Sequence, residues 1–252
     1  MALTCTRDAV VRTRNHRFSL AVLFVGVACG GVLAASDSSA SQKDGERTLE
    51  EGRTLLDAHI LNAARNFFAQ CTQQDPKSAT CFFDLARTEF YLVKAEDIAK
   101  HTEASRKMLD NAVGDAQKAV ALNDRSADAH ALLADLYGAK ITGMMSGMRY
   151  GPKAGAETQR ALQLDPNDAL VYAVQGRKYY YTPSAFGGDI DKAIESFKRA
   201  VALDPHSDED FAWLAKAYRK KGDAAHEKEA IAQALSLNSR SVFAQRVQTG
   251  LE

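Results

Sequence analysis

The sequence carries no excess charge of either sign, because its 252 residues include 32 Lys and Arg and 32 Asp and Glu. A chain with no net charge has no bulk attraction to nucleic acid, so that class of partner is not expected. Five prolines are too few for a proline-rich linker protein, and four cysteines do not make a disulfide scaffold at this length. With 46% hydrophobic residues, the composition excludes a collagen-like, disordered or polytopic membrane chain.

Sequence signatures of enzymes are also missing. There is no P-loop, no G-x-S-x-G, and no G-x-G-x-x-G after a strand pattern. His226-Glu227 begins a zinc-type H-E motif, but Ala230 stands where the second histidine is needed. The six histidines are scattered without paired metal spacing. The sequence therefore predicts a protein that is not an enzyme and that has no cofactor and no metal.

The first forty residues have the pattern of a targeting segment. Four arginines precede an apolar run that begins at Phe18, and small residues stand at positions −3 and −1 of a cleavage site after Ala34. This order is typical of a secretory signal peptide. We expect residues 1–34 to be that signal, residues 35–44 to be a disordered spacer, and the mature chain to be exported to a bacterial periplasm.

Two alternatives for the N-terminus stay open. The stretch from Phe18 to Ala35 has 18 residues, which is nearly long enough for an uncleaved membrane anchor. Cys29 follows Gly26-Val27-Ala28, a loose match to a lipidation motif, which would make the protein a lipoprotein. In either case, the sequence predicts contact with a membrane only through this N-terminal segment.

Residues 45–252 repeat one pattern: an alanine, an apolar residue four later, a small residue three later, and often a proline five later. The clearest copy is Ala193, Phe197, Ala200 and Pro205. Four further copies span residues 64–76, 112–124, 154–166 and 227–239. Two residues after each copy stands a helix N-cap candidate, namely Ser78, Ser126, Asp168, Ser207 and Ser241. Apolar residues at helical spacing resume behind each of these caps.

These copies resemble the tetratricopeptide repeat (TPR), a helix-turn-helix unit of 34 residues. The resemblance implies an all-α solenoid of about five stacked hairpins over residues 45–252, with residues 240–250 as a C-terminal capping helix. The closing positions 76, 124, 166, 205 and 239 are 48, 42, 39 and 34 residues apart. The surpluses over 34 are 14, 8, 5 and 0 residues, and we expect them to lengthen helices or loops on one edge of the array.

Two cysteines of the mature chain are placed to face each other in such a stack. Cys71 ends the second helix of one hairpin, and Cys81 lies in the first turn of the next. An exported protein meets an oxidising compartment, where the pair would form a disulfide. The alternative is two buried thiols that act as small apolar residues.

The inner face of a TPR array, made by the first helix of each hairpin, is the usual ligand surface of the family. Basic and aromatic residues on these helices are therefore candidates to bind a partner. Guanidinium and aromatic groups suit a carboxylate or an acidic peptide, although long basic side chains also keep a helix face soluble. The candidate residues are Arg87, Phe90, Tyr91, Arg177, Tyr180, Tyr181, Lys216 and Arg219.

Two insertions are distinctive, and both are expected to form loops on the same edge. Residues 138–155 contain Met144, Met145 and Met148, and residues 181–189 contain Phe186. Together they would form the rim of one small-molecule pocket. Methionines are ligands for soft metals such as Cu(I), but in such a loop they more often fill a hydrophobic gap.

The segment Phe186-Gly187-Gly188-Asp189, followed by Lys192, is similar to bacterial extracytoplasmic TPR proteins, including those that accompany TRAP-type solute transporters. The sequence as a whole predicts a non-enzymatic scaffold of the periplasm or cell envelope that binds a protein or peptide on its concave face. The alternative is a solute-binding or transporter-accessory protein in which the loops 138–155 and 181–189 surround a small molecule.

Overall fold

The structure is a computed structural model that describes residues 31–99 and 102–251. The chain forms two compact units, residues 1–39 and 40–252, and the second unit holds the helical array. Residues 1–30, which contain most of the expected signal peptide, lie outside the described residues. Within the described ranges, the chain forms eleven α-helices, one 3-10 turn and no strand, so the all-α prediction is confirmed.

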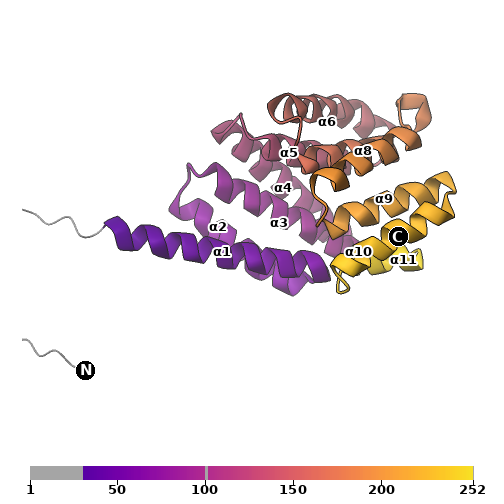
Figure 1. The fold of residues 1–252 in the computed structure, drawn as a ribbon. Coiled ribbons are helices and arrows are strands. Elements are labelled where there is room, and N and C mark those ends of the chain that lie inside the picture. The colour runs from indigo at the N-terminus through magenta and orange to yellow at the C-terminus, as the bar shows by residue number, and fades with distance from the viewer. Residues whose placement is uncertain (1–30, 100–101, 252) are drawn as a thin grey trace, which may run out of the picture. The chain divides into compact units, whose positions relative to one another are not determined.

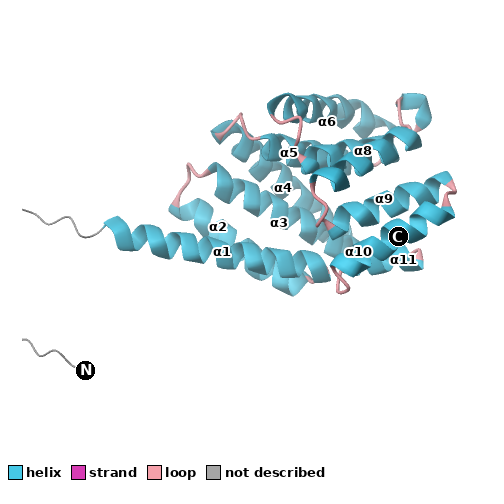
Figure 2. Ribbon diagram, viewed as in Figure 1, coloured by secondary structure: helices cyan, strands magenta, loops and turns pink. Residues whose placement is uncertain are grey.

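Ten of the helices form five antiparallel hairpins in chain order (Figures 1 and 2). The hairpins pair α3 with α4, α5 with α6, α7 with α8, and α9 with α10, and α11 packs on the last. Helix α1 pairs with α2, where Leu49 and Gly52 meet Leu61. Their bounds are α1 Gly31–Leu55, α2 Ala58–Gln74, α3 Ala79–Ile98, α4 Thr102–Leu122, α5 Ala127–Ala139, α6 Met144–Leu164, α7 Ala169–Tyr181, α8 Ile190–Leu203, α9 Asp208–Lys221, α10 Ala224–Leu237 and α11 Val242–Thr249. This is the predicted TPR solenoid.

Local sequence explains where these helices start and where they touch. Each expected N-cap residue accepts a hydrogen bond from a backbone N–H in the first turn, at Ser78, Ser126, Asp168, Ser207 and Ser241. The repeated small residues lie fully buried at the helix seams, including Ala64, Ala112, Ala161, Ala193, Ala200 and Ala234. Methyl groups at the seams let neighbouring helices approach closely, and each hairpin then covers the apolar face of the next.

Residues 35–44 were expected to be a disordered spacer, but they belong to helix α1. Polar composition alone does not prevent a helix when an adjoining turn is already held in place. Here Leu49 is buried against α2, and the helix continues towards the N-terminus from that turn. The Thr48 hydroxyl donates to the carbonyl of Asp44 at 2.8 Å, and Arg47 pairs with Asp44 at 3.0 Å.

The residues in excess of 34 per repeat have three structural forms. In the second hairpin they lengthen both helices, to 20 residues in α3 and 21 in α4, compared with 14 in α8 and in α9. In the third they lengthen α6, which has 21 residues against 13 in α5, a difference of 8. In the fourth they form the 3-10 turn Ser184–Phe186.

The loop expected over residues 138–155 is therefore mostly helix. Ser146 replaces the missing side-chain cap of Gly143, because its hydroxyl accepts the backbone N–H groups of Thr142 and Gly143 at 2.9 and 3.0 Å. Pro152 lies inside α6, where its missing N–H leaves the Met148 carbonyl without a helical partner. The buried contacts of Ala154, Thr158 and Ala161 further along the helix hold it in place.

The glycine pair of the 181–189 connection has a structural role. Gly187 has φ +91°, a left-handed conformation that other residues rarely adopt. A Cβ built on Gly188 would lie only 1.7 Å from the carbonyl oxygen of Thr182. The backbone N–H of Asp189 then donates to the carbonyl of Tyr179 at 3.2 Å. The two glycines are thus required for the turn that returns the chain into α8.

A further close approach leads to a testable prediction at Gly176 in α7. A Cβ there would lie 2.6 Å from the ring of Phe197, which is fully buried. Gly176→Ala is expected to lower the free energy of unfolding by about 1–2 kcal/mol in urea denaturation, because the ring must move within a packed seam. Gly114→Ala in α4 is the matched control, since no atom lies within 4 Å of its Cβ. The control should stabilise by up to about 1 kcal/mol, and equal effects of the two variants would contradict the close packing.

Cys71, in the last turn of α2, and Cys81, in the first turn of α3, are joined by a disulfide. Their Cα atoms are 5.7 Å apart, and the sequence separation is 10 residues. Of the two alternatives left open by the sequence, the structure has the bonded pair. Closing a loop of this length contributes about 2–3 kcal/mol to stability, and the bond links the first hairpin to the second.

Candidate partner-binding face

The first helices of the five hairpins, α1, α3, α5, α7 and α9, form what we call the inner layer. Helix α5 contacts both α3 and α7, and α7 contacts α9. Side chains of α9 also reach α1 and α3 directly. Since the candidate residues predicted from the sequence all lie on these helices, the inner layer is the surface where a partner was expected.

Glu209, in the first turn of α9, is the centre of an ionic network on the inner layer. The ammonium of Lys94 donates to its Oε1 at 2.8 Å, and the hydroxyl of Tyr91 donates to its Oε2 at 2.8 Å. The guanidinium of Arg53 lies 3.7 Å from Oε2. Burial alone would raise the pKa of Glu209, but Lys94, Arg53 and Arg177 outweigh it and hold this pKa well below its usual range. The glutamate is therefore a buried, charged counter-ion for the basic side chains around it.

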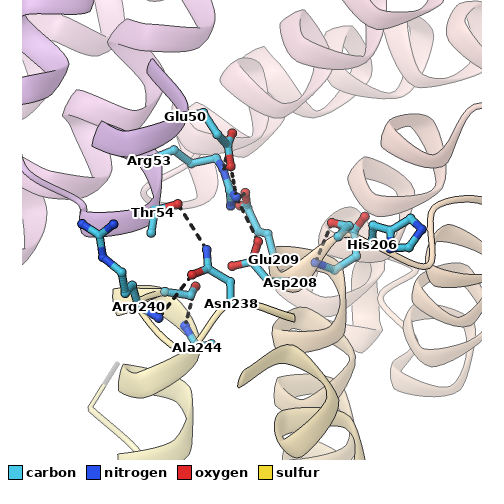
Figure 3. A network of polar contacts seen from close by, with 12 residues as sticks. Glu50, Arg53, Thr54, His206, Asp208, Glu209, Asn238, Arg240 and Ala244 are labelled. Carbon is cyan, nitrogen blue, oxygen red and sulfur yellow. Dashed lines mark hydrogen bonds and ion pairs between the residues drawn. The ribbon is translucent and has the colours of Figure 1, made fainter. Parts of the chain in front are cut away.

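The same network connects the first hairpin to the last (Figure 3). Arg53 of α1 donates to the buried carboxylate of Asp208 at 2.9 Å. The side-chain amide of Asn238, after α10, donates to the Thr54 hydroxyl at 3.2 Å, and Arg240 lies 3.6 Å from Glu51. Burial lowers the pKa of Arg53, but the surrounding carboxylates raise it overall, so the guanidinium stays charged. These contacts join residues more than 150 positions apart in the chain.

A second cluster surrounds Trp213 of α9, the only tryptophan of the sequence. Arg177 makes a two-point contact with Asp135, with distances of 3.1 and 3.0 Å, and its guanidinium lies 5.7 Å from the indole centre. Lys216 is only 7% exposed and lies 4.8 Å from the same ring. Tyr180 packs edge-on against the indole and is buried as well. These side chains therefore contact one another through an ion pair and ring contacts within the protein.

Most of the candidate residues are thus engaged inside the fold. Tyr91, Arg177, Tyr180 and Lys216 belong to the two clusters above, and Phe90 lies beneath the Lys94 ammonium at 4.6 Å. The remaining three are more accessible or peripheral: Tyr181 is 64% exposed, Arg87 is partly exposed, and Arg219 bonds Glu227 and the Val247 carbonyl. Carboxylates of the protein itself, Asp208 and Glu209 of α9 and Asp135 of α5, pair with basic side chains of this layer.

The sequence reasoning did not single out the three consecutive acidic residues Asp208, Glu209 and Asp210. Their ordinary interpretation is a favourable interaction with the helix N-terminus. The signal that would have identified them is their position on a first helix, on the layer where the other first helices carry arginine and lysine.

An open part of the inner layer lies between α1, α3 and α5, where side chains border a pocket of about 420 Å³. Three carboxylates, Glu46, Asp84 and Asp128, line it with one guanidinium, Arg87, which pairs with Asp84 at 3.2 Å. Burial raises the pKa of Asp84 to about 6, although Arg87 opposes the shift. The other lining residues are Ala79, Thr80, Phe83, Ala119, Asn123, Ser126 and Ala129. The lining of the pocket therefore combines carboxylates with a few apolar side chains.

The residues predicted to form a small-molecule rim line neither of two hollows that the structure contains. Met144, Met145, Met148 and Phe186 are between 71% and 80% exposed, and none lines the pocket above. A second hollow, of about 600 Å³, is also lined by other residues, which include Tyr172, Tyr179, Lys192 and Arg199 of α7 and α8. Elsewhere in the described part of the chain, no group of three or more His, Cys, Asp or Glu side chains is placed to hold a metal ion.

Carboxyls that are half-buried or buried predict a dependence of the free energy of unfolding on pH. The pKa of Asp168 is raised mainly by burial and further by the neighbouring Asp128. Burial raises the pKa of Asp210 to about 6. Because these pKa values lie above those of the unfolded chain, the folded state binds protons more tightly, and the free energy of unfolding should fall as pH rises from about 4 to about 7. The pKa of Glu209 is lowered instead, so its contribution to the free energy of unfolding is lost as the pH falls into the acidic range.

Urea denaturation at about pH 5.5 and about pH 7.5 tests this expectation. Asp168→Asn keeps an oxygen at the N-cap but removes the titration, so the difference between the two pH values should shrink. Asp44→Asn changes an exposed carboxyl of α1 and is the control. A wild-type protein that is more stable at the higher pH would contradict the prediction.

Three solved structures share this fold, each at low sequence identity. TTC0263, a thermophilic TPR protein of Thermus thermophilus, is 22% identical over 82% of this chain and 98% of its own, with a TM-score of 0.62. The HusA haemophore of Porphyromonas gingivalis is 17% identical over 81% and 96%, with a TM-score of 0.55. The APC/C hetero-tetramer Cut9-Hcn1 is 18% identical over 87% of this chain and 41% of that one, with a TM-score of 0.53.

Sequence comparison adds a family. The profile of the family described as regulator of microtubule dynamics protein 1-3 matches residues 48–251. None of the curated protein sequences compared matches the chain. Within residues 31–99 and 102–251, no helix combines the length and the apolar character needed to cross a membrane.

Proposed function

The chain belongs to the regulator of microtubule dynamics protein 1-3 family, and from that premise we propose that it is a non-enzymatic TPR scaffold that binds a protein partner. The observation that carries the proposal is the open pocket of the inner layer between α1, α3 and α5. Helical arrays of this kind present a preformed surface, so a partner segment is bound with little reorganisation.

The lining of the pocket supports a partner with a cationic group. Three carboxylates face one guanidinium there, whereas the basic side chains of the inner layer are already paired with Asp135, Asp208 and Glu209. A lysine or arginine side chain of the partner would meet the carboxylates of Glu46 and Asp128, and its alkyl part would lie against Phe83. The acidic partner suggested by the sequence is therefore not carried into the proposal.

The test uses two charge reversals at the exposed carboxylates of the pocket, Glu46→Lys and Asp128→Lys combined. Proteins cross-linked to the tagged wild-type chain in its native cells are identified by mass spectrometry, and purified tubulin is assayed separately because the family description names microtubules. We expect a stoichiometric partner that the pocket variant loses by about tenfold or more, since each reversal replaces an attraction with a repulsion.

The matched control is Glu195→Lys combined with Glu229→Lys, two exposed carboxylates on α8 and α10 away from the pocket. The control should keep the partner. Equal recovery by both double variants, or turnover of a substrate by the purified chain, would overturn the proposal. A small molecule retained in native mass spectrometry would instead support the solute-binding alternative, which rests on the sequence pattern of the two insertions alone.

We also propose that the protein is exported, with a periplasmic or membrane-attached mature form. Two features support this: the targeting pattern of residues 1–34, and the disulfide between Cys71 and Cys81, which persists only in an oxidising compartment. The intact mass of the protein from its native host, with and without reductant, tests both. A mass that retains the N-terminus, together with two free thiols in a soluble fraction, would contradict export.

A further inference from the structure

Seven of the eight exposed large hydrophobic side chains in the described part of the chain lie where the first helix of a hairpin passes into the second. They are Ile98, Ile141, Met144, Met145, Met148, Tyr181 and Phe186; Leu251 is the exception. In stacked antiparallel hairpins, these connections all lie at the same edge of the array (Figure 1). Large apolar side chains left exposed together at one edge indicate an interaction site.

Two stretches of this edge carry basic residues and no acidic ones. Residues 136–156 contain Lys140, Arg149 and Lys153 and no acidic residue, and residues 169–188 contain Arg177 and Lys178 and no acidic residue. The chain as a whole has equal numbers of basic and acidic residues, so this separation is local. We call the exposed residues within 140–153 and 178–186 the basic apolar edge.

Three cations of the edge remain available to a partner. Arg149, Lys153 and Lys178 are exposed, and none of them forms an ion pair with a described residue. Lys140, by contrast, is paired with Asp110 of α4. The acidic residues that follow the second segment are occupied as well, since Asp189 caps α8 and Asp191 pairs with Lys221 at 2.6 Å.

The fold holds the methionines outward. In α6, the ring of Tyr150 stacks on Tyr137 of α5, with centroids 6.0 Å apart, and Ala154 is buried. The opposite side of the same two turns carries Met144, Met145 and Met148, which are 71–80% exposed. This segment is an amphipathic helix end with apolar side chains between cations, fixed by contacts on its other face.

We propose that the basic apolar edge docks on an anionic lipid surface. The methionines and Phe186 would enter the boundary between headgroups and acyl chains, while Arg149, Lys153 and Lys178 meet lipid phosphates. A lipid surface is favoured over a protein because lysine is depleted in protein interfaces, whereas Lys and Arg beside an exposed apolar helix face are typical of interfacial helices. A single such patch binds reversibly, so a retained or lipidated N-terminus would act as the second attachment.

The test is flotation of the protein, as purified from its host, with vesicles of phosphatidylcholine alone or mixed with phosphatidylglycerol. We expect binding that requires phosphatidylglycerol and weakens with added salt. Arg149→Glu combined with Lys153→Glu should reduce that binding about tenfold or more, since each basic residue near an anionic surface contributes roughly a fivefold factor. Met144→Ser, Met145→Ser and Met148→Ser combined should reduce it as well.

Matched controls separate the edge from general charge and hydrophobicity. Lys198→Glu combined with Lys228→Glu changes exposed cations on α8 and α10, and Leu251→Ser removes the exposed apolar side chain away from the edge. Both controls should bind as the wild type does, and circular dichroism should be unchanged in every variant. No preference for phosphatidylglycerol, or equal binding by edge and control variants, would overturn the proposal. A dimer in solution that the methionine variant abolishes would also overturn it, because a second copy would then cover the edge.

Discussion

Glu209→Gln is expected to lower the free energy of unfolding by about 3 kcal/mol, the scale for removing one partner from a buried ionic network. The substitution removes the charge that Lys94, Arg53 and Arg177 share, and leaves these cations partly buried with fewer counter-ions. It also weakens the contacts of Lys94 and Tyr91 with α9, which join the second hairpin to the last. Urea denaturation followed by the fluorescence of Trp213, four positions along α9, measures the change.

The control for this variant is Glu229→Gln, an exposed carboxylate on α10. A surface substitution of this kind should change the free energy of unfolding by less than about 0.5 kcal/mol. Hydrogen exchange gives a second readout, because the amides of α1 should exchange faster in the Glu209 variant if the network holds the first hairpin against the last. If both variants behaved as the wild type does, the network would have no role in joining the two ends.

Phe197→Ala should have the largest effect, a loss of about 3–5 kcal/mol, which is typical of a phenylalanine removed from a core. Phe197 is fully buried at the fourth repeat's seam, and its ring stacks on Trp213 with centroids 6.0 Å apart and planes 13° from parallel. The void would open next to the indole, so the emission of Trp213 should shift in the folded state as well. Calorimetry and fluorescence together measure both effects.

Phe186→Ala is the matched control, since the same side chain is removed from a position that is 71% exposed. We expect a change in the unfolding temperature within experimental error for this control and no shift of the tryptophan emission. A loss of stability at Phe186 comparable to that at Phe197 would show that the 3-10 turn carries packing that its exposure does not reveal.

The parts of the fold that depend on neighbours in sequence were predictable. The spacing of Ala193, Phe197 and Ala200 places small and apolar groups on one helix face, and Ser207 two residues past Pro205 begins the next helix. Each of these signals acts within one or two turns. Residues 138–155 show the limit, because glycines and Pro152 predicted a loop, while contacts of Ala154 and Thr158 with the rest of the array keep the segment helical.

The sequence predicted which helices form the inner layer, but it did not predict which carboxylates pair with the arginines of that layer. Repeat positions alone placed Arg177 on a first helix, where a partner was expected. That Asp135 neutralises Arg177, and that Asp208 neutralises Arg53, depends on which helices come within hydrogen-bonding distance, and the Arg53–Asp208 contact joins residues 155 positions apart. The curvature of the array decides which helices come that close, and curvature cannot be predicted from a local sequence pattern.

A row of α-helical hairpins, with alanines at the seams and capped helix starts, could be read from the amino-acid pattern, since those features follow from period and local hydrogen bonding. Three features come from the packing of distant helices: the first hairpin meets the last, carboxylates of α5 and α9 neutralise basic side chains of the inner layer, and methionines are exposed along one edge. Those outcomes depend on the summed angles between successive hairpins, and a small change in each angle would separate Arg53 from Asp208.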